Sequence, residues 1–297
     1  MSDPHEPHDP RYINARPLPS GARLGGRVVV VTGSGGTGDG IGIGIGRAVA
    51  VVAALEGACV VLVDREPAGA HRTVAIAGEL GADDIEGRSL VVAADVTSAE
   101  DTARVAGLAA GHFGRIDALV NNVGIIGPAG TAVDVDPDAW RAAFEVNVTS
   151  MMLMSKACVP HIAVQGGGAI VNVSSTAGMR GGHPNLFYPT SKAAVVNMTR
   201  AMAAHHGRAG VRVNAVAPGL VETPMVGADR MSERRRGERR ESSLLGTTGT
   251  AWDVAKAVAF LLCDDARWIT GVLLPVDAGL TAAAKRPPLD PEQEPDH

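Results

Sequence analysis

The sequence predicts an α/β fold, with one Rossmann-type, doubly wound domain in which helices flank a seven-stranded parallel sheet. Three observations lead to this fold class. Short valine-rich runs alternate with helix-length amphipathic segments, a glycine-rich turn follows the first run, and the second run ends on an acidic residue, Asp64. Continuous apolar runs without polar alternation are typical of strands covered on both faces, as in a parallel sheet.

Seven apolar runs are the predicted strands, and they span residues 27–32, 59–64, 89–95, 117–122, 169–175, 211–218 and 271–277. Helices are predicted between them, among others over residues 46–56, 138–163 and 190–206. Strict alternation of strand and helix indicates a parallel sheet. In such a sheet, ligands bind beyond the carboxyl ends of the strands.

The predicted domain covers residues 25–281, and the segments before and after it, residues 1–24 and 282–297, are expected to be flexible tails. Both ends are rich in proline and have little apolar periodicity. His5 and His8 lie in the first of them and are interpreted as solvated polar residues. No metal site is predicted.

Composition excludes several function classes. A formal net charge of −5 gives no general attraction to nucleic acid or to an anionic membrane. A membrane-spanning helix needs about 18 consecutive apolar residues, and no apolar run approaches that length. The chain begins with an acidic segment that differs from a signal peptide. Three cysteines far apart in the sequence, Cys59, Cys158 and Cys263, fit neither a disulfide framework nor a zinc site. We therefore expect a cytoplasmic protein with reduced thiols.

The glycine-rich stretch "VTGSGGTGDGIGIGIGRAVA", residues 31–50, predicts a phosphate site. Backbone N–H groups at a helix N-terminus bind phosphate, and glycine permits close approach. Three overlapping frames fit the pattern G-x-x-x-G-x-G, namely Gly36/Gly40/Gly42, Gly38/Gly42/Gly44 and Gly40/Gly44/Gly46. A nucleotide triphosphatase loop is excluded because Arg47 and Ala48 stand where it needs Lys followed by Ser or Thr.

Asp64 at the end of the second strand favours NAD over NADP as the cofactor. Its carboxylate can accept hydrogen bonds from the adenosine ribose hydroxyls and repels a 2′-phosphate. Arg65 follows directly and weakens that preference.

A candidate catalytic group lies in the segment 172–197. Tyr188 and Lys192 are four residues apart at the start of a predicted helix, so their side chains share one face. A phenol with a pKa of about 10 is a poor base at neutral pH, and a neighbouring ammonium stabilises its phenolate. Ser175 ends a predicted strand, where its hydroxyl can hold a substrate oxygen. Taken singly, the three have structural alternatives: a half-buried tyrosine, a solvent-reaching lysine and a capping serine.

Several motifs in this order resemble the short-chain dehydrogenases/reductases, over about residues 26–280. They are "NNVG" (121–124), "FEVNVTS", "NVSS", "YPTSK", "APGLVET" and "ITGVLLPVDAG". The resemblance implies an NAD(P)-dependent oxidoreductase that transfers a hydride between nicotinamide and a secondary alcohol or ketone. It specifies the family and not the substrate.

The resemblance also assigns catalytic roles. It implies that Tyr188 is the general acid/base, that Lys192 lowers the pKa of Tyr188 and binds the nicotinamide ribose, and that Ser175 orients the reacting oxygen. Asn147 would hold a water that relays protons from Lys192 to solvent. A buried asparagine satisfied by backbone groups is the structural alternative for Asn147.

Further cofactor contacts follow from the resemblance, beside Asp64, Arg65, Tyr188 and Lys192. Those at the phosphate turn are Gly33, Gly44, Ile45 and Gly46. Those at the adenine and along the cleft are Asp95, Val96, Asn122 and Gly124. Those around the nicotinamide are Pro218, Gly219, Val221 and Thr223.

The glycine turn departs from the family pattern TGxxxGxG. Thr37 and Asp39 occupy the expected glycine positions, and Gly44 comes seven residues later than that pattern allows. Residues 35–42 therefore form an insertion. We hypothesise that it is a flap that closes over the cofactor through Ile41 or Ile43; a surface bulge is the alternative.

The substrate side is less specific. Residues 225–246 correspond to a substrate lid, and six arginines between Arg230 and Arg240 could bind a carboxylate or a coenzyme A phosphate. The favoured alternative is a solvated helix in which Glu233, Glu238 and Glu241 offset the arginines. The further candidates for substrate contact, with a surface turn as the alternative, are Arg180, His183 and Phe187.

Three functions remain open at this point. The first is an alcohol dehydrogenase or ketoreductase, the second an acyl-thioester (3-oxoacyl) reductase of the same fold, and the third a nucleotide sensor without catalysis. Resemblance implies a homo-oligomer, commonly a tetramer. Met151, Met152 and Met154 are interpreted as core or interface residues.

Overall fold

The computed structural model describes residues 22–36, 43–227 and 231–283. Its centre is a seven-stranded parallel sheet with the order β3-β2-β1-β4-β5-β6-β9. The strands are β1 (Val28–Thr32), β2 (Cys59–Asp64), β3 (Ser89–Ala93), β4 (Ala118–Asn121), β5 (Gly168–Val173), β6 (Val211–Pro218) and β9 (Leu273–Val276). The predicted fold class and the seven predicted strands are therefore confirmed. A two-stranded parallel sheet, which the sequence did not predict, joins β7 (Val221–Glu222) to β8 (Gly249–Thr250).

The direction in which the sheet grows reverses between β1 and β4. In β1, Val31 lies opposite Leu62 of β2 on one side and Val120 of β4 on the other. The connections after β1 and after β4 therefore diverge, and they leave a crevice at the carboxyl ends of these strands. This switch point is the position at which the fold predicts a ligand.

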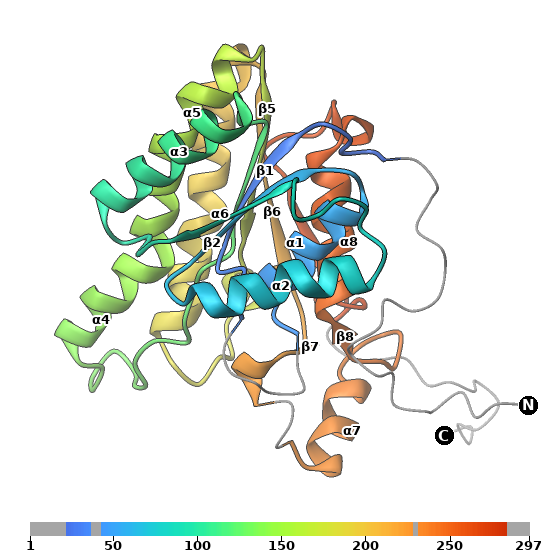
Figure 1. The fold of residues 1–297 in the computed structure, drawn as a ribbon. Coiled ribbons are helices and arrows are strands. Elements are labelled where there is room, and N and C mark those ends of the chain that lie inside the picture. Colours follow the sequence, from blue (N-terminus) through green and yellow to red (C-terminus); the bar gives the residue numbers. More distant parts are fainter. Residues whose placement is uncertain (1–21, 37–42, 228–230, 284–297) are drawn as a thin grey trace, which may run out of the picture.

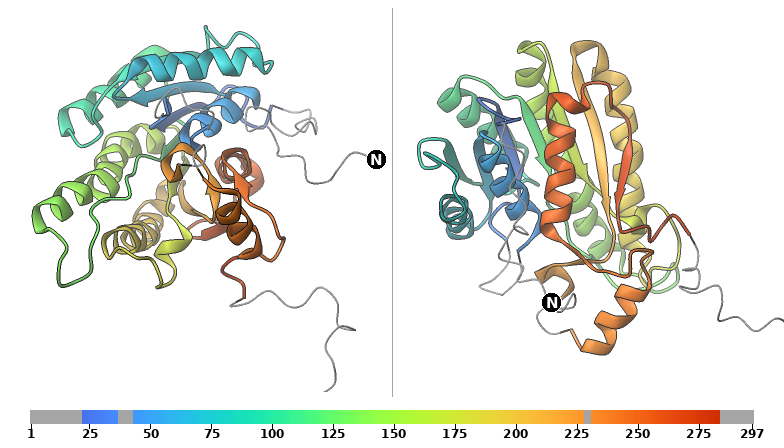
Figure 2. Two further views of the ribbon diagram at one scale, coloured as in Figure 1. Left: turned by 90° about the horizontal axis from the view of Figure 1, so that it is seen from below. Right: turned by 90° about the vertical axis from the view of Figure 1, so that its right-hand side faces the viewer.

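Helices cover both faces of the sheet (Figures 1 and 2). Alternate residues of β1 enter two separate cores: Val29 and Val31 pack with α1, α2 and α8, and Val28 and Val30 pack with α3, α5 and α6. The first set of helices is α1 (Ile45–Leu55), α2 (Pro67–Glu79) and α8 (Ala251–Leu262). The second set is α3 (Ala99–Phe113), α5 (Ser150–Val164) and α6 (Phe187–His206), with α4 (Pro137–Phe144) leading into α5.

The helix predicted over 138–163 is present from Pro137 to Val164, but it is not a regular α-helix throughout. A π-helical turn, Glu145–Thr149, separates α4 from α5, and Asn147 lies inside it with 0% of its surface exposed. The Asn147 amide is held by the backbone of Ile125, which both donates to its Oδ1 (2.7 Å) and accepts from its Nδ2 (2.8 Å). Single π-turns within helices often mark functional sites, so this turn concerns the site as well as the fold.

The ordered domain begins earlier than residue 25. Leu24, which the sequence assigned to a tail, is fully buried, and its N–H donates to the Glu56 carbonyl at 3.0 Å. Arg23 forms an ion pair with Glu56, whose side chain is only 1% exposed. Residues 22–24 therefore belong to the domain because they cover a buried carboxylate. Residues 1–21 and 284–297 lie outside the described part of the chain.

Arg23→Ala tests this boundary. Removing the guanidinium leaves the Glu56 carboxylate buried without its cation, so we expect the free energy of unfolding to fall by about 3 kcal/mol. Arg72→Ala is the matched control, because Arg72 pairs with Glu79 at 2.6 Å while both side chains are more than half exposed (57% and 58%). Urea denaturation measures both variants, and equal losses would contradict the prediction.

Candidate active site

The phosphate turn depends on two glycines that bring α1 against the end of β1. Gly33 has φ +66°, and a Cβ placed on Gly46 would lie 2.2 Å from the Gly33 carbonyl oxygen. Gly44 is the N-cap of α1 and makes no side-chain cap, so the first N–H groups of α1 remain available to an anion. This geometry supports Gly33, Gly44, Ile45 and Gly46 as the phosphate-facing residues.

Asp64 ends β2 beside this turn. Its Oδ2 accepts a hydrogen bond from Gly35 N (2.7 Å), and its Oδ1 accepts one from Glu66 N (3.1 Å). Both contacts hold the carboxylate at the wall of the cleft that Asp64 lines together with Arg65. The Arg65 side chain is exposed.

Arg47 braces the same turn, and sequence reasoning missed this role. Its guanidinium is buried and donates to the Gly35 carbonyl, to the Gly69 carbonyl (3.2 Å) and, through Nε, to Thr73 Oγ1 (3.0 Å). Burial lowers the pKa of Arg47, with a further lowering from Arg72 and an opposing effect of Asp64. The available signal was that Arg47 is the single charged residue of an otherwise apolar α1.

Of the insertion, residues 35–42, the structure describes residues 35 and 36. Residues 37–42, among them Thr37, Asp39 and Ile41, lie outside the described part of the chain. Ile43 is 7% exposed and packs in the core with α1. The hypothesis that Ile43 folds over the cofactor is therefore corrected, because its side chain is committed to the core and is not among the residues that line the cleft.

The ends of β3 and β4 form the next part of the cleft. Asp95 accepts hydrogen bonds from Thr97 N (2.9 Å) and Thr97 Oγ1 (2.7 Å), and these bonds lower the pKa of the Asp95 carboxyl. Asn122 is tied to β1, because its N donates to Thr32 Oγ1 (3.0 Å) and its Nδ2 donates to the Thr32 carbonyl (3.0 Å). Thr32 thus fixes the "NNVG" segment, a second contribution that the motifs did not reveal.

Ser175, Tyr188 and Lys192 converge between β5 and α6. Because α6 begins at Phe187, Tyr188 and Lys192 occupy its first turns and share one face. Ser174 Oγ donates to the Lys192 carbonyl (2.9 Å), which fastens the end of β5 to this helix. The Ser175 side chain lies close enough to the Tyr188 phenol to affect its pKa.

Burial dominates the electrostatics of this group. It raises the pKa of Tyr188, while the hydrogen bond from Ser175 lowers that pKa. Lys192 is 4% exposed, and burial lowers its pKa to about 8. Its Nζ donates to the Val173 carbonyl (3.0 Å) and lies 5.9 Å from the centre of the Tyr188 ring. Each charge alone is disfavoured here, so a Tyr188 phenolate and a Lys192 ammonium stabilise each other when both form.

Asn147 is connected to Tyr188 through Ser191. Its Nδ2 also donates to Ser191 Oγ (3.1 Å), and Ser191 Oγ in turn donates to the Tyr188 carbonyl (2.9 Å). Asn147 thereby joins the loop after β4 to α6. Its side chain does not line the cleft, and its contacts are those expected of an asparagine satisfied by its surroundings.

One cleft of about 460 Å³ collects every residue predicted to bind the cofactor, together with Ser175. The cofactor set is Gly33, Gly44, Ile45, Gly46, Asp64, Arg65, Asp95, Val96, Asn122, Gly124, Tyr188, Lys192, Pro218, Gly219, Val221 and Thr223. The same cleft has an apolar wall formed by Ile125, Val146, Met225 and Val226. Met225 and Val226 begin the segment 225–246 that the sequence assigned to a substrate lid, whereas no role was predicted for Ile125 or Val146.

The three predicted substrate contacts are not among the residues that line the cleft. Phe187 is fully buried and packs edge-to-face on Trp140, with ring centres 5.3 Å apart, so it is a core residue. Arg180 is exposed and donates to the Leu280 carbonyl at 3.3 Å. His183 lies nearest to the chemistry, because its ring centre is 5.2 Å from that of Tyr188. The predictions for Phe187 and Arg180 are therefore corrected.

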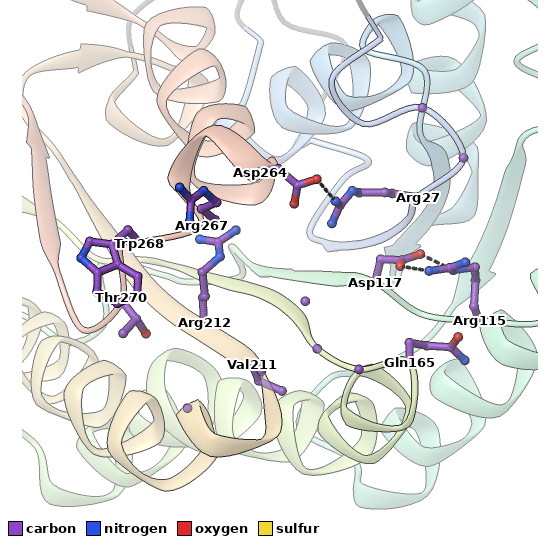
Figure 3. Close-up of a pocket in the computed structure, with 17 residues that line it drawn as sticks. Arg27, Arg115, Asp117, Gln165, Val211, Arg212, Asp264, Arg267, Trp268 and Thr270 are labelled. Carbon is purple, nitrogen blue, oxygen red and sulfur yellow. Dashed lines mark hydrogen bonds and ion pairs between the residues drawn. The ribbon is translucent and has the colours of Figure 1, made fainter.

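A second cavity, of about 770 Å³, lies at the amino ends of the strands, opposite the cleft (Figure 3). It is larger, but most of its charged groups already have partners. Arg27 pairs with Asp264 (2.6 Å), Arg115 with Asp117 (2.5 Å), and Arg212 donates to the Leu261 carbonyl (2.8 Å). This cavity contains none of the proton-transfer residues. Within the described residues, no three His, Cys, Asp or Glu side chains gather as metal ligands.

Comparisons with known proteins show the family to which the chain belongs. A family model described as enoyl-(acyl carrier protein) reductase matches residues 40–281. The chain belongs to the short-chain dehydrogenase/reductase family and is an oxidoreductase. It is 38% identical over 264 residues to 2-(S)-hydroxypropyl-CoM dehydrogenase 3 of Xanthobacter autotrophicus, covering 88% of this chain and 98% of that protein. It is 35% identical over 265 residues to meso-2,3-butanediol dehydrogenase of Serratia marcescens, covering 89% and 98%.

A solved structure has the same fold. The structure of a 7α-hydroxysteroid dehydrogenase complexed with NADH and 7-oxo glycochenodeoxycholic acid matches with a TM-score of 0.78 and 30% sequence identity. The match covers 87% of this chain and 95% of that one. Within the described ranges, no helix combines the length and the apolar character that crossing a membrane requires.

Lys192→Met tests the cost of the buried charge. Since the pKa of Lys192 is lowered to about 8 from 10.5, the unfolded chain binds more protons than the folded one between these values. Burial therefore destabilises the wild type fully below about pH 8, and this penalty disappears as the pH rises toward 10.5. We expect the variant to be about 2 kcal/mol more stable at pH 7, with a gain that shrinks by pH 10. Urea denaturation at both pH values measures it, and a gain independent of pH would contradict this account.

Proposed function

We propose that the protein is an NAD-dependent dehydrogenase of secondary alcohols that also reduces the corresponding ketones. The observation that carries this proposal is the meeting of Ser175, Tyr188 and Lys192 at the wall of the cleft that the glycine turn and Asp64 also line. A serine hydroxyl, a phenol and an ammonium at one oxygen site form a proton-transfer device. When bound, the nicotinamide supplies hydride acceptance and donation.

Proton transfer falls to Tyr188. In alcohol oxidation, Ser175 Oγ holds the substrate oxygen, and the Tyr188 phenolate takes its proton as the C–H bond breaks. The Lys192 ammonium stabilises that phenolate and is positioned for the nicotinamide ribose. Asn147 holds the Ile125 backbone at 2.7 and 2.8 Å beside this group, and we propose that the loop so fixed supports a water relay from Lys192 to solvent.

Tyr188→Phe separates this function from nucleotide sensing. Without the phenol oxygen, kcat for alcohol oxidation should fall about 10³-fold, while the Kd for NADH should change little because the ring remains. Steady-state rates on a panel of secondary alcohols and NADH fluorescence titration measure the two effects. Full activity in the variant would refute the catalytic role, and tight NADH binding by a wild type that turns over no alcohol or ketone would favour the sensor.

We propose NAD as the preferred cofactor because of Asp64. Its carboxylate is fixed by Gly35 N (2.7 Å) at the cleft wall, where a ribose 2′-phosphate would meet a like charge. The exposed Arg65 is the nearest cation in sequence and moderates this effect. The substrate body is proposed to be apolar, since Ile125 and Met225 line the cleft with 42% and 51% of their surfaces exposed.

Asp64→Asn tests the cofactor preference with little change in shape. We expect wild-type kcat/KM to be higher with NAD than with NADP, and the variant to lose about tenfold of that ratio through a lower KM for NADP. Glu66→Gln is the control, because it removes the same charge two residues further on at an exposed position. A wild type that uses NADP at least as well as NAD would refute the preference.

An acyl-thioester (3-oxoacyl) reductase is the second candidate, and the arginines of α7 (Glu233–Glu241) are the observation that favours it.

We further propose a cytoplasmic homo-oligomer, tetrameric by resemblance. The exposure of Met152 in α5 (43%) supports the homo-oligomer, whereas Met151 and Met154 are buried. Burial raises the pKa of the Cys158 thiol to about 12, as in an unreactive reduced cysteine.

A further inference from the structure

The first turn of α6, which carries Tyr188, depends on contacts from other parts of the chain. The N-cap of this helix is Leu186, and no side chain caps it. The first N–H groups of an α-helix have no partner within the helix, so an uncapped first turn needs support from outside. Leu186 N donates to the Gly130 carbonyl at 2.9 Å. Phe187 packs edge-to-face on Trp140. These contacts fix the start of the helix, and the Tyr188 ring has contacts of its own.

His183 contacts the Tyr188 ring directly. The two ring centres are 5.2 Å apart, and the ring planes are inclined by 35°. Aromatic rings at this separation attract each other and prefer defined mutual orientations. Lys192 Nζ lies 5.9 Å from the centre of the same Tyr188 ring. The ring is therefore held both by the loop that precedes α6 and by the next turn of the helix.

The imidazole of His183 is itself held by the backbone. Its Nδ1 accepts a hydrogen bond from Asn185 N (3.1 Å), and the Asn185 carbonyl oxygen lies 3.1 Å from the same nitrogen. Nδ1 therefore has a partner within reach whether or not it carries a proton. Gly182, which leads into His183, has φ +96°, a conformation that other residues rarely adopt. The half-buried imidazole is thus fixed by the loop from which it projects.

We propose that His183 is a positioning residue whose ring packs on the Tyr188 ring and holds the phenol oxygen beside Ser175. His183 does not line the cleft, so its effect on the reaction passes through Tyr188. Proton transfer needs the phenol within hydrogen-bond reach of the substrate oxygen, and a displacement of about 1 Å can cost about 100-fold in rate. This inference rests on the proposed function, because it concerns how the proton-transfer group of the same site is oriented.

Two substitutions of His183 test the contact. His183→Ala removes the ring, and we expect kcat for a secondary alcohol to fall about 10- to 30-fold. KM and the Kd for NADH should change less than about twofold, because His183 lies outside the cleft. His183→Phe keeps a ring without its nitrogens, so kcat should return to within about threefold of the wild type.

His112→Ala is the matched control. His112 belongs to another histidine–aromatic pair, with 4.5 Å between its ring centre and that of Phe113 at the end of α3. Neither residue lines the cleft, so kcat should equal that of the wild type. Thermal unfolding of every variant checks that the domain is folded at the temperature of the assay.

A double variant separates positioning from an independent role. In Tyr188→Phe the phenol oxygen that His183 would position is absent. Adding His183→Ala to this variant should therefore lower the residual kcat by less than about twofold. Rates at high enzyme concentration measure this residual activity.

Each outcome bears on the proposal. Wild-type kcat in His183→Ala, or a loss confined to KM, would leave His183 as a residue of a surface turn and overturn the positioning role. A folded His183→Phe as slow as His183→Ala would overturn it too, because the imidazole nitrogens and not the ring would then be required. A further 10-fold loss in the double variant would show a role independent of the phenol. Failure of the proposed function is distinct from all of these, since the wild type would then turn over no alcohol or ketone.

Discussion

The close approach of α1 to the end of β1 is the constraint on which the rest of the site depends. Any side chain at Gly46 would strike the Gly33 carbonyl, with a Cβ at 2.2 Å. Because neither residue carries one, the N-terminus of α1 opens directly at the switch point between β1 and β4, where a parallel sheet leaves its crevice. The guanidinium of Arg47, the next residue, donates a hydrogen bond to the Gly35 carbonyl. Gly35 N in turn donates to the carboxylate of Asp64 and fixes it.

The positions of Tyr188 and Lys192 also depend on hydrogen bonds between buried polar groups. Asn147 and Ser191 tie the loop after β4 to α6, and Ser174 ties the end of β5 to the same helix. These bonds keep Tyr188 and Lys192 in a desolvated position, where each charge is unfavourable alone and favourable with the other. Burial therefore costs stability at Lys192 and makes its ammonium effective on a phenolate.

Local patterns predicted much of this protein. Valine-rich runs gave all seven strands of the main sheet, because strands covered on both faces must be apolar throughout. The spacing of Tyr188 and Lys192 placed them on one helix face, and that relation is local. Phe187 and Arg180 were misjudged because closeness in sequence to Tyr188 does not say which way a side chain points. The π-turn at Asn147 was not predicted, and the contacts that Asn147 makes there are with Ile125, a residue distant in sequence.

What the sequence determined by itself was therefore the order of strands and helices along the chain and the candidates for the reactive groups, since periodicity and motif spacing are properties of neighbouring residues. Only the tertiary structure decided which glycines touch, which arginine is buried, and which arginine of α7 keeps one donor without a hydrogen-bond partner among the described residues. Several contacts form only after the chain has folded, namely those of Leu24 with Glu56, of Arg47 with Gly69 and of Arg239 with Val221. Burial and hydrogen-bond satisfaction are set by such long-range contacts, and so are the pKa of Lys192 and the orphaned donor of Arg239.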